Sequence, residues 1–227
     1  MQNFLLSPSF TNSFDFSYVF KTFITKWYYY LALAVILVLV VCFLFIKKQP
    51  ERNRLSKTQK IVYTGILSSF CAVANIFDIP INSSLQLSLV ATVGFVSGYL
   101  LGGGLSFAVC FIGDLVGGII APKGPYNPII AIGTGLWGLI PGIAFSYFRG
   151  NEVLKLVISF VLGFAIISLT INTVGYALMY PKYTTFALSF AMLPFKLIVA
   201  VVNAVVSAGL MVAMRKVLPK DKFLINK

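Results

Sequence analysis

Long hydrophobic runs alternate with short polar segments along almost the whole chain of 227 residues. An α-helix of about 20 apolar residues crosses the hydrocarbon core of a bilayer, which is roughly 30 Å thick. The first such run covers residues 27–46. Six further runs follow at residues 60–77, 87–101, 103–121, 128–147, 153–179 and 186–214. The pattern predicts an all-α integral membrane protein, a six-helix bundle preceded by one extra N-terminal transmembrane helix.

The polar segments between the runs divide the chain into five parts. Residues 1–26 lack the basic start, short apolar stretch and cleavage site of a signal peptide, so we expect an extracellular segment before an uncleaved helix. Residues 47–59 form a basic cytoplasmic linker in which Pro50 interrupts any continuous helix. Residues 60–216 hold the six-helix substrate-binding membrane domain, and residues 217–227 form a basic cytoplasmic tail.

The placement of positive charge predicts the orientation. The chain has 18 Lys and Arg against 6 Asp and Glu, and these basic residues lie mostly in short loops, which is typical of a membrane protein rather than a nucleic-acid surface. One side receives six from residues 47–60, two from Arg149 and Lys155, and five from the tail, whereas the other side receives four. We therefore expect a multi-pass protein of a bacterial cell membrane, surrounded by lipid, with its C-terminus cytoplasmic and its N-terminus outside.

Absent residue types exclude several kinds of chemistry. The chain has no histidine, so zinc sites of the H-E-x-x-H type and Ser-His-Asp triads are excluded. Its three cysteines lie inside apolar runs without metal-ligand spacing. No Walker A sequence occurs, so we expect no ATP hydrolysis by this chain. The sequence predicts no catalytic residue, no metal site, no cofactor and no nucleic-acid partner.

Polar side chains within the spans are the first candidates for function. Asp114 lies in the third of the six runs and Lys196 in the last. Ionisable groups at membrane depth cost several kcal/mol unless they are paired or hydrated, so they commonly mark functional sites. We expect both to contact a substrate or to pair across a polar cavity, although Asp114 has the alternative of bonding a neighbouring helix end. Asn172 places an amide in mid-span, where it either bonds another helix or touches a ligand.

Three loops on the predicted outer side carry polar and aromatic groups beside prolines. Their sequences are DIPINSSLQ, PKGPYNP and YPKYTT. The side chains of these loops either converge over a cavity that opens outward or serve as turn residues at a wet interface. The candidates for substrate contact are Asn82, Gln86, Lys123, Tyr126, Asn127, Lys182 and Tyr183.

Small residues recur at a spacing of four in the first of the six runs. Gly65 and Ser69 form one such pair, and Ser68 and Ala72 form another. This spacing places each pair on one helical stripe, where another helix can approach closely. The stripe serves either packing inside the bundle or contact with a partner subunit.

Four short motifs stand out between residues 76 and 148: I-P-I, G-Y-L-x-G, G-D-x-x-G and P-x-G-P-Y-x-P. The segment with these motifs resembles the substrate-binding S-components of energy-coupling factor (ECF) vitamin transporters, closest to their folate-type subgroup. The stretch from Leu169 to Thr173 and the pair Leu193-Pro194 are also similar to that subgroup, and the resemblance covers roughly residues 58–216. Positions that match the family pattern are Asp114, Gly117, Pro122, Gly124, Pro125, Tyr126 and Pro128.

The resemblance implies a six-helix bundle with both ends cytoplasmic that binds one vitamin beneath its outer loops. It also implies docking onto a transmembrane coupling subunit through the small residues of the first helix, with two ATPase subunits supplying energy. A folate-like vitamin is the first expectation, and cobalamin, pantothenate and pyridoxal-type compounds stay open. Folate-type members usually carry an arginine near the start of the last helix, where this chain has Thr184 and Thr185. Lys182 or Lys196 would replace its charge but not its bidentate fork.

Three other classes of protein are weighed against this interpretation. A self-contained transporter or channel often shows an internal repeat, and residues 58–135 and 136–216 show no convincing one. An intramembrane enzyme would need a cluster of reactive groups, whereas the two deep ionisable residues lie in separate spans. A purely structural subunit would have little use for polar outer loops.

Overall fold

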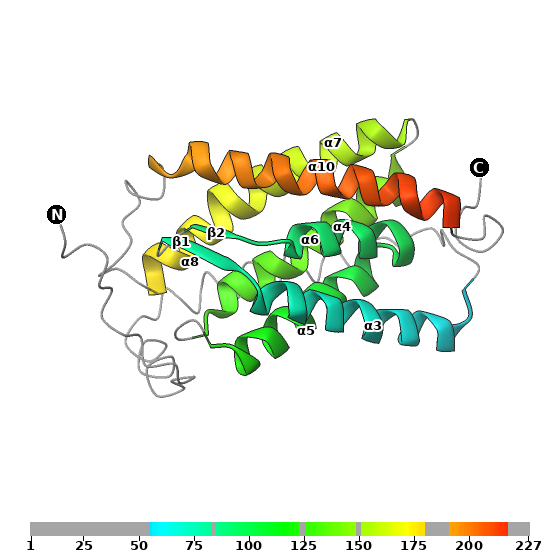
Figure 1. The fold of residues 1–227 in the computed structure, drawn as a ribbon, viewed down its shortest axis with the longest axis horizontal. Helices are drawn as coiled ribbons and strands as arrows, with labels where there is room; N and C mark the ends of the chain where they lie inside the picture. The colour runs from blue at the N-terminus through cyan, green and yellow to red at the C-terminus, as the bar shows by residue number, and fades with distance from the viewer. Residues whose placement is uncertain (1–54, 83–84, 123–125, 149–150, 180–190, 218–227) are drawn as a thin grey trace.

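The computed structural model of the protein describes residues 55–82, 85–122, 126–148, 151–179 and 191–217. Six helical segments run back and forth through this part of the chain, as Figure 1 shows. They are α3 (Lys57–Ile76), α4 (Val90–Leu101), α5 (Gly103–Ile120), α6 (Pro128–Tyr147), α7 (Glu152–Gly163) continuing through the π-helix η2 (Phe164–Ile171) into α8 (Asn172–Met179), and α10 (Leu193–Val217). Each apolar run predicted after the basic linker thus forms a helix. The extra span predicted at residues 27–46 lies outside the described residues.

One predicted loop is not irregular. Residues Ile79–Asn82 (β1) pair antiparallel with Leu85–Leu87 (β2), with Ile79 opposite Leu87. The all-α prediction is therefore corrected for the DIPINSSLQ loop, where a short antiparallel ladder lies between α3 and α4. The hairpin and α8 lie at the end of the bundle opposite to the one where α3 begins and α10 ends (Figure 1).

Capping residues set where two of the helices begin. Helix α3 begins at Lys57, before the predicted residue 60, because Ser56 and Gln59 form a reciprocal capping box with contacts of 3.2 and 3.0 Å. Helix α6 begins with Pro128 directly after its N-cap Asn127, whose side-chain oxygen accepts from the backbone N–H of Ile129. The linker boundary predicted at residues 59 and 60 is thus a few residues late.

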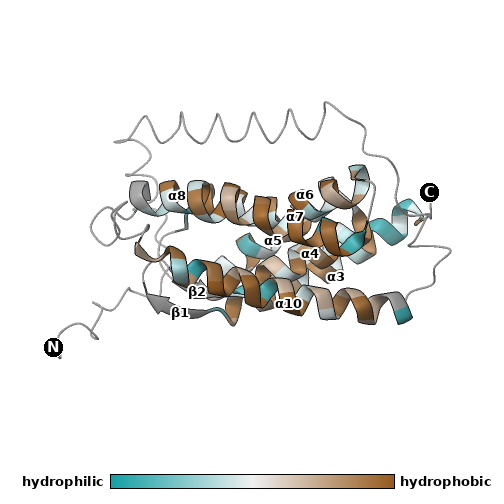
Figure 2. Ribbon diagram, turned by 90° about the horizontal axis from the view of Figure 1, so that it is seen from above, coloured by the Kyte–Doolittle hydropathy of each residue, from teal (hydrophilic) through white to brown (hydrophobic). Residues whose placement is uncertain are grey.

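Several helices of the described chain have the length and apolarity of membrane spans. Four segments meet both conditions: Gly103–Ile120, Pro128–Tyr147, Glu152–Tyr176 and Leu193–Met214. Helix α4 is apolar but shorter, at 12 residues. Figure 2 shows hydrophobic residues along most of the length of the helices. On α10 they include Val201 and Val205, which are exposed in the isolated chain. Such faces are suited to contact with lipid.

Glycines allow α4, α5 and α6 to approach closely. Gly102 joins α4 to α5 with a φ of 85°, a left-handed backbone conformation that glycine adopts without strain. A Cβ atom added to Gly142 of α6 would overlap the backbone of Gly103. Helix α5 packs extensively on both α3 and α6, so α5 and α6 form the centre of the bundle.

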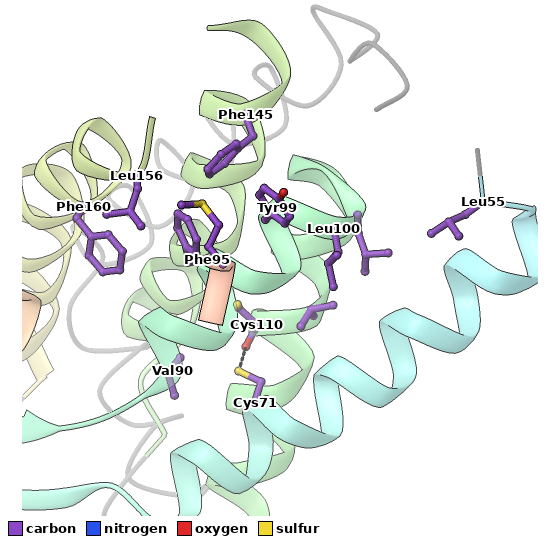
Figure 3. Packing of buried hydrophobic residues seen from close by; sticks show 13 residues of the cluster. Leu55, Cys71, Val90, Phe95, Tyr99, Leu100, Cys110, Phe145, Leu156 and Phe160 are labelled. Atoms are coloured by element: carbon purple, nitrogen blue, oxygen red, sulfur yellow. Dashed lines mark hydrogen bonds between the residues drawn. The ribbon is translucent and has the colours of Figure 1, made fainter. Parts of the chain in front are cut away.

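An aromatic cluster fills the interior at the far end from the hairpin (Figure 3). The ring of Phe145 packs edge to face against Phe95 and Tyr99, with centroids 5.3 and 5.1 Å apart. Such T-shaped contacts add stability beyond the burial of apolar area. Cys71 and Cys110 are buried on α3 and α5, where the Cys71 thiol lies 3.9 Å from the carbonyl oxygen of Cys110. They pack as small apolar residues, as their positions in the sequence indicate.

Candidate functional site

A polar cavity of about 170 Å³ lies between the helices in the half of the bundle nearer the hairpin. It is enclosed by the C-terminal end of α3, the first turn of α4, the middle of α5, the first half of α6, the η2–α8 segment and the first half of α10. Its polar and aromatic lining residues are Asn75, Asp78, Ser88, Asp114, Thr134, Trp137, Ser168, Asn172, Tyr176, Lys196 and Asn203. The cavity brings together three residues that the sequence singled out, namely Asp114, Asn172 and Lys196.

Lys196 is a buried cation in the wall of this cavity. Only 8% of the residue is exposed. Its ammonium donates to the hydroxyl of Thr173 at 3.5 Å, and this is its one hydrogen bond within the described part of the chain. An ammonium has three hydrogen-bond donors, so two of them are available to a ligand in the cavity. Burying this charge is costly without such partners.

The π-helix η2 determines how Thr173 is placed. The hydroxyl of Thr173 donates at 3.1 Å to the carbonyl oxygen of Ser168, five residues earlier. A carbonyl five positions back is within reach because the backbone is widened to π geometry between Phe164 and Ile171. Short π segments in α-helices are frequent at functional sites. Here the segment ends at Asn172 and lies against the cavity that Lys196 also lines.

Asn172 contributes an acceptor to the same wall. Its side-chain oxygen is buried and has no hydrogen-bond partner among the described residues. It lies close to Gly133 of α6, where an added Cβ would be 3.0 Å from it. A buried acceptor without a partner costs about 1–3 kcal/mol, so a ligand donor at this position would recover that free energy.

Asp114 lines the same cavity and is held by donors from two neighbouring helices. Its carboxylate oxygen Oδ1 accepts from the amide of Asn75 on α3 at 2.9 Å and from the hydroxyl of Thr134 on α6 at 3.2 Å. Asp78, which follows α3, lines the same cavity. The carboxylate thus connects three helices, as the structural interpretation expects, and it also lines the cavity, so its contact with a substrate stays a prediction.

Asn203 attaches α10 to α4 beside the cavity. The residue is 1% exposed, and its amide accepts from Thr92 at 2.8 Å and donates to the backbone oxygen of Ser88 at 2.9 Å. Most other side chains of α10 point outward, so this pair of hydrogen bonds is the main polar connection between the two helices within the described residues. Lys196 lies about two turns before Asn203 on the same face of α10, so the hydrogen bonds of Asn203 also fix the rotation of the helix that turns Lys196 toward the cavity.

The predicted loop residues do not share one role. Asn127 is used by the fold, since its oxygen caps α6 and its amide donates to the carbonyl oxygen of Gly175 at 3.0 Å. Tyr126 packs on Gly118, and neither it nor Asn127 lines the cavity. Burial raises the pKa of the Tyr126 phenol above its ordinary value, and the charge of Asp114 adds to the rise. The phenol therefore stays neutral at physiological pH.

The remaining predicted loop residues fall on the hairpin or outside the described chain. Asn82 and Gln86 belong to the two strands, where Gln86 is opposite Pro80. Lys123, Lys182 and Tyr183 lie outside the described residues. Their contact with a substrate stays a prediction.

The small residues of α3 point in two directions. Ser68 and Ala72 are buried in the bundle, where the close approach of Gly113 and Gly117 on α5 leaves no space for a partner. Gly65 and Ser69 are exposed on the other side of the helix, and a Cβ at Gly65 would meet nothing within 4 Å. Ser68 and Ala72 therefore serve packing with α5, and only Gly65 and Ser69 are placed for contact with a partner.

Sequence reasoning missed the lining residues Ser168, Tyr176 and Asn203, although their spacing carries a signal. Ser168 and Tyr176 each lie four residues from Asn172, and Asn203 lies seven residues from Lys196, so each set lies on one helix face. Such polar stripes within apolar spans indicate an interior cavity. The pairing of Asn75 with Asp114 had no such signal, because the two residues are 39 positions apart.

A six-helix membrane bundle with a polar cavity near one end defines a membrane protein that binds a small solute. A family model described as "ECF-type riboflavin transporter, S component" matches residues 55–218, and the chain belongs to this family. The predicted resemblance to S-components is thus confirmed, and the protein is a transporter subunit rather than an enzyme.

A solved structure shows a similar fold. The crystal structure of FolT bound with folic acid aligns with a TM-score of 0.55 at 21% sequence identity, covering 66% of this chain and 90% of that one. At this identity the likeness concerns the fold. A search of curated proteins finds no match.

Proposed function

We propose that this S-component captures a water-soluble vitamin with a fused heteroaromatic ring, with riboflavin as the first candidate, and delivers it to an ATP-driven coupling module. The observation that carries the proposal is the buried Lys196 ammonium, which shares one cavity with the unpartnered amide oxygen of Asn172. Membership in the riboflavin transporter family supports the choice of ring.

The chemistry of the lining suits such a ring. Carbonyl oxygens and ring nitrogens would accept hydrogen bonds from Lys196, and an imide N–H would donate to Asn172. Trp137 and Tyr176 also line the cavity and provide aromatic surface against which a flat ring packs. A few placed polar groups on an otherwise apolar wall are typical of small-molecule sites.

Folate is the second candidate. The four motifs between residues 76 and 148 are similar to the folate-type subgroup, and the fold is similar to that of FolT. Folate carries carboxylates, which Lys196 would attract, whereas Asp78 and Asp114 would repel them. Because riboflavin is neutral, the described lining favours riboflavin over folate.

A binding experiment tests the ligand. The full chain is purified in detergent, any retained ligand is identified by mass spectrometry, and riboflavin and folate are titrated by calorimetry. We expect riboflavin to bind more tightly than folate. The variant Ser146→Ala should bind riboflavin as the native chain does, because Ser146 is not among the described lining residues and its hydroxyl donates to the carbonyl oxygen of Gly142 on its own helix. A chain that retains and binds neither compound would contradict the proposed ligand class.

We also propose that the coupling module consists of a transmembrane subunit and two ATPase subunits, docked at the exposed small residues of α3. A bulky side chain at Gly65 would block a close helix approach there, so Gly65→Leu should abolish co-purification of the module and leave riboflavin binding intact. Gly209→Leu is the matched control, since Gly209 on α10 is equally exposed and also has nothing within 4 Å of a Cβ. Equal loss of the module in both variants would argue against this interface.

The proposed topology places the hairpin end of the bundle outside and the ends of α3 and α10 in the cytoplasm. Support comes from the positive charge of the segments at that end. Single cysteines in residues 122–126 and 218–227 should react with a membrane-impermeant thiol reagent from opposite sides. An anchoring or contact role for residues 27–46 remains a prediction.

A further inference from the structure

We propose that Asp114 is a specificity-determining residue that makes the cavity reject ligands carrying an anion, so that the protein takes riboflavin in preference to its phosphorylated form. The inference rests on the proposed function and adds a selection rule to it. It starts from the charges of the lining. Among the described lining residues, Asp78 and Asp114 are acidic and Lys196 alone is basic.

The charge of Asp114 is fixed in place. Donors from Asn75 on α3 and Thr134 on α6 both contact Oδ1, at 2.9 and 3.2 Å. A carboxylate held by two side-chain donors on rigid helices cannot swing away from an incoming anion without losing both hydrogen bonds. The carboxylate therefore keeps a fixed position in the wall of the cavity.

Lys196 does not neutralise this wall. Its ammonium donates to Thr173 on the η2–α8 side rather than to either carboxylate. The cavity thus offers two different charged groups, an ammonium bonded to Thr173 and a carboxylate bonded to Asn75 and Thr134. A ligand that fits both presents acceptors to the ammonium and hydroxyl or N–H donors to the carboxylate, and riboflavin offers both kinds of group.

Both carboxylates line the same cavity as Lys196. Charges that share a cavity between packed helices interact more strongly than they do in bulk water. A phosphate within the cavity would therefore lie close to Asp114 as well as to Lys196. Riboflavin carries no such charge and meets no repulsion.

The test compares the affinities for riboflavin and flavin mononucleotide, measured with the purified full chain. The readout is the dissociation constant for flavin mononucleotide divided by that for riboflavin. Loss of a purely structural contact weakens the binding of both ligands alike and leaves this ratio unchanged. We expect the native chain to favour riboflavin. Asp114→Asn keeps the shape of the side chain and an acceptor oxygen but removes the charge. It should lower the ratio by about tenfold or more, since like charges placed together weaken binding by at least that factor.

Two further variants keep the proposal testable if Asp114→Asn does not fold. Asp78→Asn should narrow the ratio in the same direction. Lys196→Met removes the only cation of the described lining and should widen it. Thr134→Val, which loses one donor to Asp114 and keeps the charge, should leave the ratio in favour of riboflavin.

The outcomes separate this inference from the function on which it rests. If the native chain binds neither flavin, the proposed riboflavin function fails and the selection rule fails with it. If the native chain binds riboflavin, but the ratio is the same in the native chain and in the folded carboxylate variants, the selection rule alone is wrong. A narrowed ratio in Asp114→Asn and a widened one in Lys196→Met would support it.

Discussion

Replacing Lys196 with methionine should have opposite effects on ligand binding and on the stability of the ligand-free protein. Methionine keeps the length and the apolar stem of the side chain and removes the ammonium. In the structure the residue is 8% exposed, and its ammonium makes one hydrogen bond of 3.5 Å among the described residues. A buried charge with so few hydrogen bonds destabilises the ligand-free protein, and a ligand with acceptor atoms supplies the missing hydrogen bonds.

Both magnitudes follow from these contacts. A hydrogen bond to a charged group contributes about 1.5–3 kcal/mol, so its loss should weaken riboflavin binding by about 10- to 150-fold, at tenfold for each 1.4 kcal/mol. Removing the buried charge should stabilise the ligand-free protein by about 1 kcal/mol. For a chain of this length the corresponding rise in melting temperature is about 2–4 °C.

Two assays on the same detergent-purified sample measure these effects. Calorimetric titration gives the affinity, and a thermal melt without ligand gives the stability. Lys155→Met is the matched control, because Lys155 is a lysine on α7 that lies near the ring of Phe145 and does not line the cavity. If Lys196→Met melts lower than the native chain and binds riboflavin equally well, Lys196 is a structural residue and the reasoning about the cavity is wrong.

Three further predictions concern the framework around the site, and thermal melts measure each of them. Asn203→Leu should destabilise the protein by about 2–4 kcal/mol, because it leaves Thr92 and a buried carbonyl oxygen without their partner. Gly142→Ala should destabilise by about 3 kcal/mol, since its Cβ would overlap the backbone at the start of α5, whereas the exposed Gly209→Ala should have little effect. Asn127→Ala should lower stability by about 1–2 kcal/mol through loss of the α6 cap, with riboflavin affinity nearly unchanged.

Each of these predictions has an outcome that contradicts it. A native-like melt of Asn203→Leu would show that α10 is held to α4 mainly by apolar contacts. Equal melting temperatures for the two glycine variants would mean that α5 and α6 are not in close contact at Gly142. A large loss of affinity with full stability in Asn127→Ala would move Asn127 from the framework into the ligand site.

The outcomes for individual residues show where sequence reasoning reached its limit. The structure places Asp114, Asn172 and Lys196 around one polar cavity, since buried polar groups in apolar spans must turn toward one another or toward water. Their contact with a substrate stays a prediction. Asn127 looked like a loop residue available to a ligand. Its amide instead bonds Gly175, 48 positions later, and no local pattern reveals such a partner. The contact faces of α3 likewise depended on where α5 lies.

The sequence by itself determined that this is a membrane protein, how many helices follow the basic linker and roughly where each begins and ends. These features depend on the local transfer free energy of about 20 consecutive side chains, which composition expresses directly. The tertiary structure alone decided how each helix is rotated about its axis, and therefore that Asn75 and Thr134 bond Asp114 and that Lys196 and Asn172 line the same cavity. Rotation is set by packing between helices that are distant in the chain, such as the glycine contacts of α5 and α6, and that information is shared among residues rather than carried by any one segment.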